Sequence, residues 1–576
     1  MKIFTKFAYL LTVIWLLSAC SEDSAVQDQL AIESQDPATT IYTNGDIITV
    51  NAAQPNVEAV AVRDGKIFAV GDHPGVMALS GDNVILRDLQ GGTLIPGLID
   101  AHGHLTMTAR NQAAVNVSSP PVGDVKNIDD LLGRLNQALA EKGGGSWLIG
   151  WGYDDSLLAE QRHPTRADLD RVSTENPIAL IHVSGHFIAC NSKCLELGGV
   201  TAQSEDLAGG VIRRVAGSRE PNGVLEELAA MWPVYMAMPQ PTETQFVGLL
   251  GPAQQYYASF GITTVQEGAT RPEELKILKS AAAANKLYLD VVAYVYLQIP
   301  GVTLEDVTPS ARYQNHFRVG GIKLVLDGSP QGKTAWLSKP YLHPPHGQTQ
   351  GYAGYGTLTD DQAIELVSSA FEKNVPVLAH ANGDAAADQF IGAVKAASVV
   401  HGVADRRPVM IHAQTVREDQ LDAMQELGML PSYFSAHTFF WGDWHRDSVF
   451  GEPRASRISP LKTTADRGMP FTTHNDTPIV PPDMMRLLWA SVNRITRSGK
   501  ILGEAQRVSP LEALESMTIH AAYQYFEEDS KGSIEVGKLA DLVILDHNPL
   551  TVDPIAIKDI VVLETIKSGT TIYSRP

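Results

Sequence analysis

The sequence predicts an α/β fold: a (β/α)8 barrel of the TIM type with a large insertion after its first strand, and a small β-sandwich built from both chain ends. Three observations predict it. Eight short apolar runs alternate with helical segments through the middle of the chain, and β-rich pieces occur at both ends. The first two runs are about 160 residues apart, far more than an ordinary crossover needs.

The eight apolar runs are the expected barrel strands. Parallel strands are covered on both faces, so they appear as continuous apolar runs rather than as alternating patterns. Helical segments fill the gaps, and one of them opens with a capping box formed by Thr359 and Gln362. The expected strands are 93–101, 263–266, 289–296, 322–326, 375–379, 409–411, 429–434 and 470–473.

The pieces that flank the barrel are expected to combine. The first piece, 39–93, contains two hairpin-turn dipeptides, and the second, 529–576, has the same β-rich pattern. Neither could bury its apolar face alone, so we expect the two to pack as one sandwich. The barrel then spans 94–528, with the insertion at about 106–258.

Residues 1–19 have the pattern of an export signal. A basic start with Lys2 and Lys6 precedes an apolar core that is too short to span a bilayer. The segment ends in LSAC, which resembles a bacterial lipobox, where the cysteine, here Cys20, is lipidated. We therefore expect a lipoprotein anchored through Cys20 to the outer membrane and facing the periplasm, with a flexible tether at 20–38. A plain secretory signal is the alternative.

The amino-acid composition limits the classes of molecule that the protein is expected to bind. The formal net charge of -20 and the lack of any Lys/Arg-rich block argue against a nucleic acid, so a small-molecule substrate is expected. The hydrophobic content of 44% is that of a soluble globular protein, and a homodimer stays open. Cys190 and Cys194 can either pair in an oxidising compartment or remain as buried thiols.

Histidines and acids end four of the expected strands. His102 and His104 close the first, His380 the fifth, His412 the sixth and Asp476 the eighth. Chemistry in such barrels gathers at the carboxyl ends of the strands, so these side chains should meet there. Taken singly, each has an ordinary interpretation as a rim, core or turn residue. Their coincidence at one end of one barrel favours a metal site.

Lys323 lies within the fourth expected strand, which is otherwise apolar. A buried ammonium beside metal ions would be unfavourable, so the pKa of this lysine should be lowered. A neutral lysine can react with carbon dioxide to give a carbamate, an anionic ligand able to bridge two metals. Neutral imidazoles suit zinc, and a carboxylate adds an oxygen ligand and a proton acceptor.

Several motifs resemble one known family. GLIDAHGHL, GIKLVLDGS, LAHANGDAA, IHAQ, HNDTP and GKLADLVILD are similar to segments of the amidohydrolase superfamily, in its YtcJ-like amidohydrolase family 3 branch, which includes N-substituted formamide deformylases. The resemblance implies a metal-dependent barrel hydrolase with a carboxylated lysine, and assigns the metal ligands to His102, His104, Lys323, His380, His412 and Asp476. It also implies that His186 and Asn191 shape the substrate pocket. Ile411, Asn475 and the SPQG segment depart from the common pattern.

The expected reaction is hydrolysis of an amide or another non-peptide C–N bond. Two zinc ions would be held with a carbamate on Lys323, a metal-bridging hydroxide would attack the carbonyl, and Asp476 would act as general base and then general acid. One alternative is a mononuclear deaminase or other hydrolase with a free Lys323 amine. Another is a non-catalytic lipoprotein that binds a small molecule.

Aromatic residues follow the seventh expected strand. His437 and Trp441 lie in SAHTFFWGDW, at the face where substrate should bind. They can form a wall that stacks on an acyl group, or they can pack a long loop.

Overall fold

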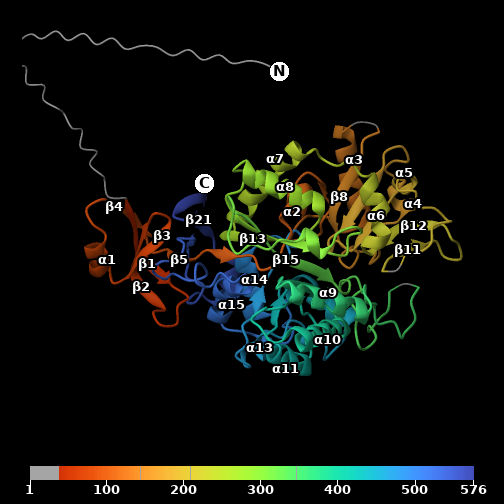
Figure 1. Ribbon diagram of the computed structural model, residues 1–576. Coiled ribbons are helices and arrows are strands. Elements are labelled where there is room, and N and C mark those ends of the chain that lie inside the picture. Colours follow the sequence, from red (N-terminus) through yellow and green to blue (C-terminus); the bar gives the residue numbers. More distant parts are fainter. Residues whose placement is uncertain (1–37, 143–144, 208, 346) are drawn as a thin grey trace, which may run out of the picture.

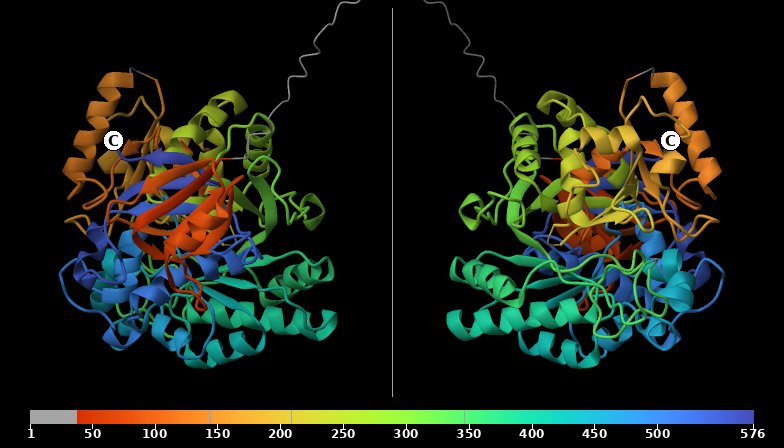
Figure 2. Two further views of the ribbon diagram at one scale, coloured as in Figure 1. Left: turned by 90° about the vertical axis from the view of Figure 1, so that its left-hand side faces the viewer. Right: turned by 90° about the vertical axis from the view of Figure 1, so that its right-hand side faces the viewer.

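A computed structural model describes residues 38–142, 145–207, 209–345 and 347–576. The predicted signal segment, Cys20 and the tether up to residue 37 lie outside the described residues. The described residues form three sheets, one central and two others that lie at opposite ends of it (Figures 1 and 2). Among the helices of the described residues, none has the length and apolar character to cross a membrane.

The central sheet has eight strands, and every hydrogen-bonded pair in it is parallel. The strands follow one another in chain order, as expected from the eight apolar runs. They are β6 (Leu98–Ile99), β13 (Ile262–Thr270), β14 (Asp290–Tyr296), β15 (Phe317–Val325), β16 (Val377–Ala381), β17 (Val409–His412), β18 (Leu430–Tyr433) and β19 (Thr472–Thr473).

The segments after the first and last strands lie together. The backbone N–H of His104 donates to the carbonyl of Thr477 at 2.7 Å, and that of Asp476 donates to the carbonyl of His102 at 3.2 Å. These two bonds bring both ends of the sheet to one place, directly beside the predicted metal ligands.

Helices connect the strands. The predicted capping box is present: the Thr359 side chain accepts from the backbone N–H of Gln362 at the start of its helix. The larger helices are α2 (Leu105–Asn111), α7 (Glu243–Ala258), α8 (Pro272–Ala283), α9 (Asp360–Glu372), α10 (Asp384–His401), α11 (Glu418–Glu426), α12 (His437–Trp444), α14 (Met484–Asn493), α15 (Pro510–Ser516) and α16 (Ile519–Gln524).

The two chain ends share a second sheet of eight strands, which includes β5 at its centre. β5 pairs in parallel with β1 and antiparallel with β20, so the ends join edge to edge, whereas we expected two sheets packed face to face. The expected first barrel strand is thus divided at Gly97, between β5 and β6. The strands are β1 (Thr39–Ile48), β2 (Asn56–Arg63), β3 (Lys66–Gly71), β4 (Val84–Asp88), β5 (Thr93–Pro96), β20 (Leu542–Leu545), β21 (Val562–Lys567) and β22 (Thr570–Ser574).

The segment between β6 and β13 forms the third sheet, of six strands (Figure 1). Cys190 and Cys194 form a disulfide there, with Cα atoms 5.4 Å apart, which decides between the two alternatives for these cysteines. The elements are β7 (Val115–Asn116), α3 (Ile128–Lys142), β8 (Leu148–Tyr153), α4 (Arg166–Leu169), β9 (Ile178–His182), β10 (Phe187–Cys190), α5 (Ser192–Leu197), β11 (Val211–Arg214), β12 (Pro221–Glu226) and α6 (Glu227–Ala237).

Candidate metal centre

The six predicted ligands come together at the carboxyl edge of the central sheet. Lys323 lies on β15, His380 on β16, and His412 is the last residue of β17. The two histidines of HGH follow β6, and Asp476 follows β19. All are buried except His104, which is partly exposed. Residues more than 370 positions apart in sequence thus share one site.

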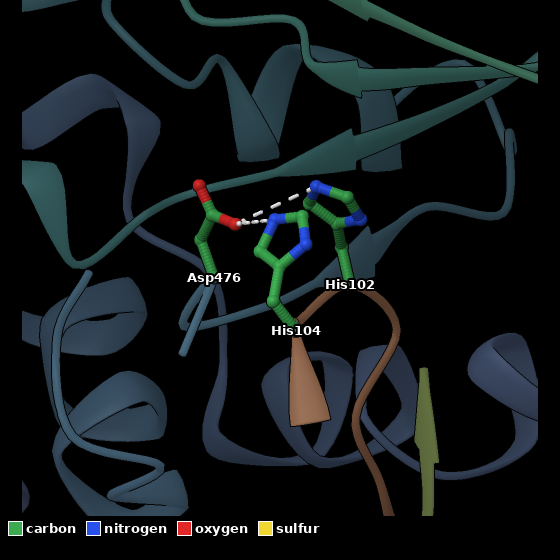
Figure 3. A group of neighbouring side chains, drawn as sticks. All are labelled: His102, His104 and Asp476. Atoms are coloured by element: carbon green, nitrogen blue, oxygen red, sulfur yellow. Dashed lines mark ion pairs between the residues drawn. The ribbon is translucent and has the colours of Figure 1, made fainter. Parts of the chain in front are cut away.

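Asp476 faces the two histidines of the first strand end (Figure 3). Its Oδ1 lies 3.1 Å from His104 Nε2 and 3.5 Å from His102 Nε2. One ligand atom from each of these three residues falls within 4.8 Å of the others, a spacing that one metal ion can bridge. The three therefore form one half of the predicted centre.

The other half lies on the opposite side of Asp476. His412 Nε2 is 3.9 Å from Asp476 Oδ2 and 3.0 Å from His380 Nδ1. Lys323 Nζ lies 3.1 Å from His102 Nε2, close to both halves. The carboxylate of Asp476 thus has histidine nitrogens within reach of each of its oxygens.

Neighbouring groups hold the histidine rings in place. His102 Nδ1–H donates to Gln266 Oε1 at 2.5 Å, and Gln266 is itself fixed because its amide donates to the carbonyl of Ala101. His380 Nε2–H donates to the carbonyl of Gly328 at 3.1 Å. With these protons placed, His102 Nε2 and His380 Nδ1 keep lone pairs directed into the site.

The backbone is also strained at the site. His412 has φ of 72° and Asp476 has φ of 54°, both in the left-handed region that non-glycine residues seldom adopt. Such conformations persist where the surrounding structure imposes them, and they cluster at functional sites. Here they aim a histidine and an aspartate from two strand ends toward one point.

Burial sets the charge state of the site. It lowers the pKa of His102, His380 and His412 well below the usual value, so these imidazoles are neutral at pH 7. Burial alone would raise the pKa of Asp476, but His102 and His104 outweigh it and hold that pKa below its ordinary value. Burial also lowers the pKa of Lys323 to about 7, against the opposing effect of Asp476.

These residues fit a divalent metal. Neutral imidazole nitrogens and an ionised carboxylate are the ligands that zinc takes. Asp476 Oδ1 is buried, and the Nε2 nitrogens of His104 and His102 face it. A cation there could be coordinated by all three atoms.

Two further residues at the site were not predicted. His474 Nε2 lies 3.3 Å from His412 Nδ1, and its own Nδ1 contacts Ser432 Oγ at 2.9 Å. It stands two residues before Asp476, the spacing that puts side chains on one face of a strand, so the HNDTP motif could have indicated it. Glu267, at the end of β13, lies beside His104 through a backbone bridge.

A cavity of about 590 Å³ begins at the metal centre and extends toward the third sheet. His104 and His186 line it, which agrees with the pocket role predicted for His186. His186 Nδ1 contacts Glu227 Oε2 at 2.7 Å. Much of the remaining wall is apolar and includes Met107, Trp151, Ile181, Met231, Met238 and Leu249.

Asn191, also predicted to shape the pocket, is not among the residues that line this cavity. Its amide oxygen accepts from the backbone N–H groups of Ile178 and Cys194, and its amide nitrogen donates to two carbonyls. All four of its hydrogen bonds are made within the chain, and its side chain is fully buried. Asn191 caps α5 and has no free group for a substrate.

His437 and Trp441 are not among the residues that line this cavity, and their polar atoms contact other side chains of the chain. His437 Nδ1 contacts His445 Nε2 at 2.9 Å, and Trp441 Nε1 donates to Asp154 Oδ2 at 2.6 Å. Both side chains are almost completely buried. Sequence position after a strand predicts the face of the sheet, but not which side of a following helix turns toward the substrate.

Comparison with known proteins identifies the family. The family model described as "Amidohydrolase family" matches residues 86–573, most of the chain and every residue of the metal centre. The chain belongs to the amidohydrolase family. It is therefore a hydrolase, and its buried His and Asp group is a fitting metal site for an amidohydrolase.

Relatives of this amidohydrolase align over nearly the whole chain. It is 26% identical to an N-substituted formamide deformylase of Arthrobacter pascens, over 92% of this chain and 98% of the relative. It is also 26% identical to the putative amidohydrolase YtcJ of Bacillus subtilis (strain 168), over 93% and 99%. An uncharacterised metal-dependent hydrolase from Pyrococcus horikoshii OT3 superposes with a TM-score of 0.70 at 25% identity, covering 90% of this chain and 99% of that one.

Proposed function

We propose that this amidohydrolase cleaves the C–N bond of a small amide or formamide that is not a peptide. The observation that carries the proposal is the position of Asp476 between two groups of histidines, one member of which, His104, lines a cavity that is largely apolar. Similarity to a formamide deformylase over almost the full chain supports it. Water adds its hydroxyl group to the carbonyl carbon and its hydrogen to nitrogen, giving a carboxylic acid and an amine.

Residues of the chain would bind the metal ions and transfer the proton. His102, His104 and Asp476 would hold one zinc ion, His380 and His412 a second, and Lys323, once carboxylated, would contact both. When bound, the metal supplies an activated water and polarises the carbonyl. Asp476 takes the proton of that water and passes it to the departing nitrogen, which is general base and then general acid catalysis. Its lowered pKa keeps it ionised and ready to accept the proton.

His186 is proposed to orient the substrate. Glu227 engages its Nδ1, which leaves Nε2 as the ring nitrogen available to a carbonyl or amide group in the cavity. The side chain of Glu227 is buried, and its backbone has φ of 59°, so the pair is held rigidly at the site.

The test is a hydrolysis screen. The zinc-loaded full chain is assayed on N-formyl and N-acyl amines with apolar substituents, by detection of the released amine. We expect turnover of at least one series and its loss when the metal is removed by chelation. Absence of turnover across both series, with metal bound, would contradict the proposal.

A mononuclear deaminase is the second candidate, because Lys323 contacts His102 directly and could remain a free amine. A single bound metal per chain, no carbamate on Lys323 in electron density, and release of ammonia from amino-substituted rings would favour it. Two metals and a carbamate would favour the binuclear amidohydrolase.

We also propose a closed barrel for the central sheet and an exported, lipid-anchored location for the protein. Two backbone bonds join the ends of the parallel sheet, which supports a closed (β/α)8 barrel with the third sheet as its insertion. The lipobox at Cys20 supports an exported, lipid-anchored protein. Labelling with a fatty acid analogue that disappears in Cys20→Ala would support the anchor, and equal labelling would contradict it.

A further inference from the structure

The cavity has a charged region away from the metal centre. Two arginines line it, Arg110 at the end of α2 and Arg271 just before α8. Among the cavity-lining residues these are the only arginines, and the acids that interact with them are Glu267, Glu273 and Glu274. A negatively charged ligand would bind here only if acidic side chains of the protein leave one of the two guanidinium groups without a partner.

Arg271 is fully engaged within the chain. Its Nη2 donates to Glu274 Oε1 at 2.6 Å and its Nε to the same oxygen at 3.2 Å. Its backbone N–H donates to the other oxygen of Glu274 at 3.0 Å. Glu274 therefore forms a charge-assisted pair with Arg271, whose Nε also lies 3.3 Å from Glu273 Oε1.

Arg110 has no such partner. The nearest carboxylate oxygen of Glu274 lies 3.9 Å from its Nη2, beyond hydrogen-bond distance. Its Nη1 donates to the neutral amide of Gln240 at 2.8 Å. Its Nε is buried and, in the part of the chain that the structure describes, makes no hydrogen bond.

Glu267, another acid near Arg110, already accepts a hydrogen bond from the backbone. Glu267 Oε2 accepts from the backbone N–H of Thr106 at 2.6 Å, at the start of α2. Arg110 lies at the other end of that helix, with its guanidinium over the ring of Phe246 at 4.7 Å. The charge of Arg110 is thus left without a hydrogen-bonded anion beside a largely apolar cavity.

The unpaired atoms lie on one edge of the guanidinium. Nε and Nη2 together form the fork that binds a carboxylate through two parallel hydrogen bonds. We propose that Arg110 binds the carboxylate of the substrate, so that the enzyme acts on amides whose apolar segment ends in a carboxylate. This inference rests on the proposed amide hydrolysis and names its substrate class.

The length of the apolar segment follows from α2. Six residues separate His104 at the metal centre from Arg110, which is a rise of about 9 Å along the helix at 1.5 Å per residue. The wall between them includes Met107 from the same helix. Linear formamido acids of graded chain length are therefore the substrates that test this separation.

The experiment compares matched substrates on the metal-loaded full chain. Each formamido acid is paired with the formamido alcohol of the same length, and kcat/KM is measured for both. We expect wild type to prefer the acid by about 10- to 100-fold, the effect of a hydrogen-bonded charge pair. Arg110→Gln should bring the ratio close to one, and Arg110→Lys should leave an intermediate ratio.

Arg406→Gln is the matched control. Arg406 also has a buried Nε without a hydrogen bond among the described residues and lies over a phenylalanine ring, Phe371, at 4.6 Å, but it does not line the cavity. We expect its acid-to-alcohol ratio to equal that of wild type. A wild-type ratio near one, or a ratio unchanged in Arg110→Gln, would overturn the proposal.

A binding measurement distinguishes failure of the Arg110 proposal from failure of the proposed hydrolysis. If neither substrate is hydrolysed, thermal unfolding is followed with octanoate and with octanol. A stabilisation by octanoate that Arg110→Gln loses would support the anion site while the proposed reaction fails. Equal stabilisation of wild type and Arg110→Gln by octanoate would place the carboxylate elsewhere and contradict the inference.

Discussion

Asp476 is the residue at which the two histidine groups meet. Its Oδ1 faces His102 and His104, and its Oδ2 faces His412. His102 and His104 also hold the pKa of Asp476 below the ordinary value, so it is a carboxylate at any pH at which the enzyme would work. One residue therefore serves both metal binding and proton transfer in the proposed reaction.

Asp476→Asn should keep the fold and most of the metal but lose turnover by at least about a thousandfold, because an amide cannot carry the proton. Five other predicted ligands remain to hold the metal. Steady-state kinetics, metal analysis and circular dichroism on the same preparation check this. Turnover within a few fold of wild type would show that another group moves the proton.

Lys323 predicts a pH dependence for assembly of the site. Burial lowers its pKa to about 7, and only the neutral amine reacts with carbon dioxide. The neutral fraction is about 10% at pH 6 and about 90% at pH 8, so metal uptake by metal-free protein at a fixed concentration of dissolved carbon dioxide should rise over that range. The buried histidines have lowered pKa values and stay neutral throughout it.

Uptake is followed by metal analysis after fixed times, with bicarbonate-free buffer as the control. Rates that do not change between pH 6 and pH 8, or that do not depend on bicarbonate, would argue against the carbamate and for the mononuclear alternative.

At the scale of elements, α2 carries His104 at its N-cap and Arg110 in its last turn. The imidazole of His104 makes no capping hydrogen bond, and Glu267 from β13 caps the helix instead through the N–H of Thr106. A carboxylate at a helix N-terminus also interacts favourably with the helix dipole. The cap thereby fixes the position of a metal ligand.

Glu267→Ala should be less stable than Glu267→Gln by about 1 kcal/mol, since both remove the charge but only glutamine keeps an acceptor for Thr106. Chemical unfolding of the two variants measures the difference. If the alanine variant were as stable as the glutamine variant, the capping role would be wrong.

Much of the site could be predicted from the sequence because metal ligands follow buried strands at fixed places. His380 and His412 each end an apolar run, and that register alone places them at one edge of the sheet. The sequence was less informative where side-chain direction depends on a loop or helix. His437 and Trp441 follow β18 but do not line the cavity. The amide atoms of Asn191 are hydrogen-bonded to backbone groups.

Contacts between residues far apart in the chain could not be predicted from local sequence patterns either. The capping of α2 by Glu267 joins residues 161 positions apart, and no local spacing indicates it. The strand predicted at 93–101 is split because β5 finds a partner in β20, near the other end of the chain. Pairings of this kind depend on the complete fold.

At the scale of the whole molecule, a buried charge cluster joins the central sheet to the sheet of the chain ends. Asp290 at the start of β14 accepts from Lys531 at 2.5 Å and from Lys567 of β21 at 2.6 Å. Lys567 also donates to Asp541 at 2.7 Å. Burial would raise the pKa of Asp290, but Lys531 and Lys567 outweigh it and hold that pKa well below its usual value.

Asp290→Asn should destabilise the protein by about 1–3 kcal/mol at pH 7, because two buried lysines lose the carboxylate that they share while each keeps one other acid, Glu527 or Asp541. A lowered folded-state pKa means that the contribution is present above the unfolded pKa of about 4 and is lost as pH falls through the folded value. The difference from wild type should therefore persist from pH 7 to pH 5 and shrink only in stronger acid.

Urea unfolding across this pH range tests the cluster. Asp124→Asn, which removes an exposed ion pair with Arg134, is the control and should leave stability almost unchanged. Equal effects of the two substitutions would mean that the buried cluster contributes no more than a surface pair.

Metal-dependent catalysis is tested most directly by the rate of formamide hydrolysis as zinc is titrated into metal-free protein in bicarbonate buffer. We expect no turnover without zinc and a rate that rises until two equivalents per chain are bound, with Asp476→Asn inactive at every ratio. Turnover that is equal with and without zinc would contradict a metal-dependent amidohydrolase, and saturation at one equivalent would contradict the binuclear centre.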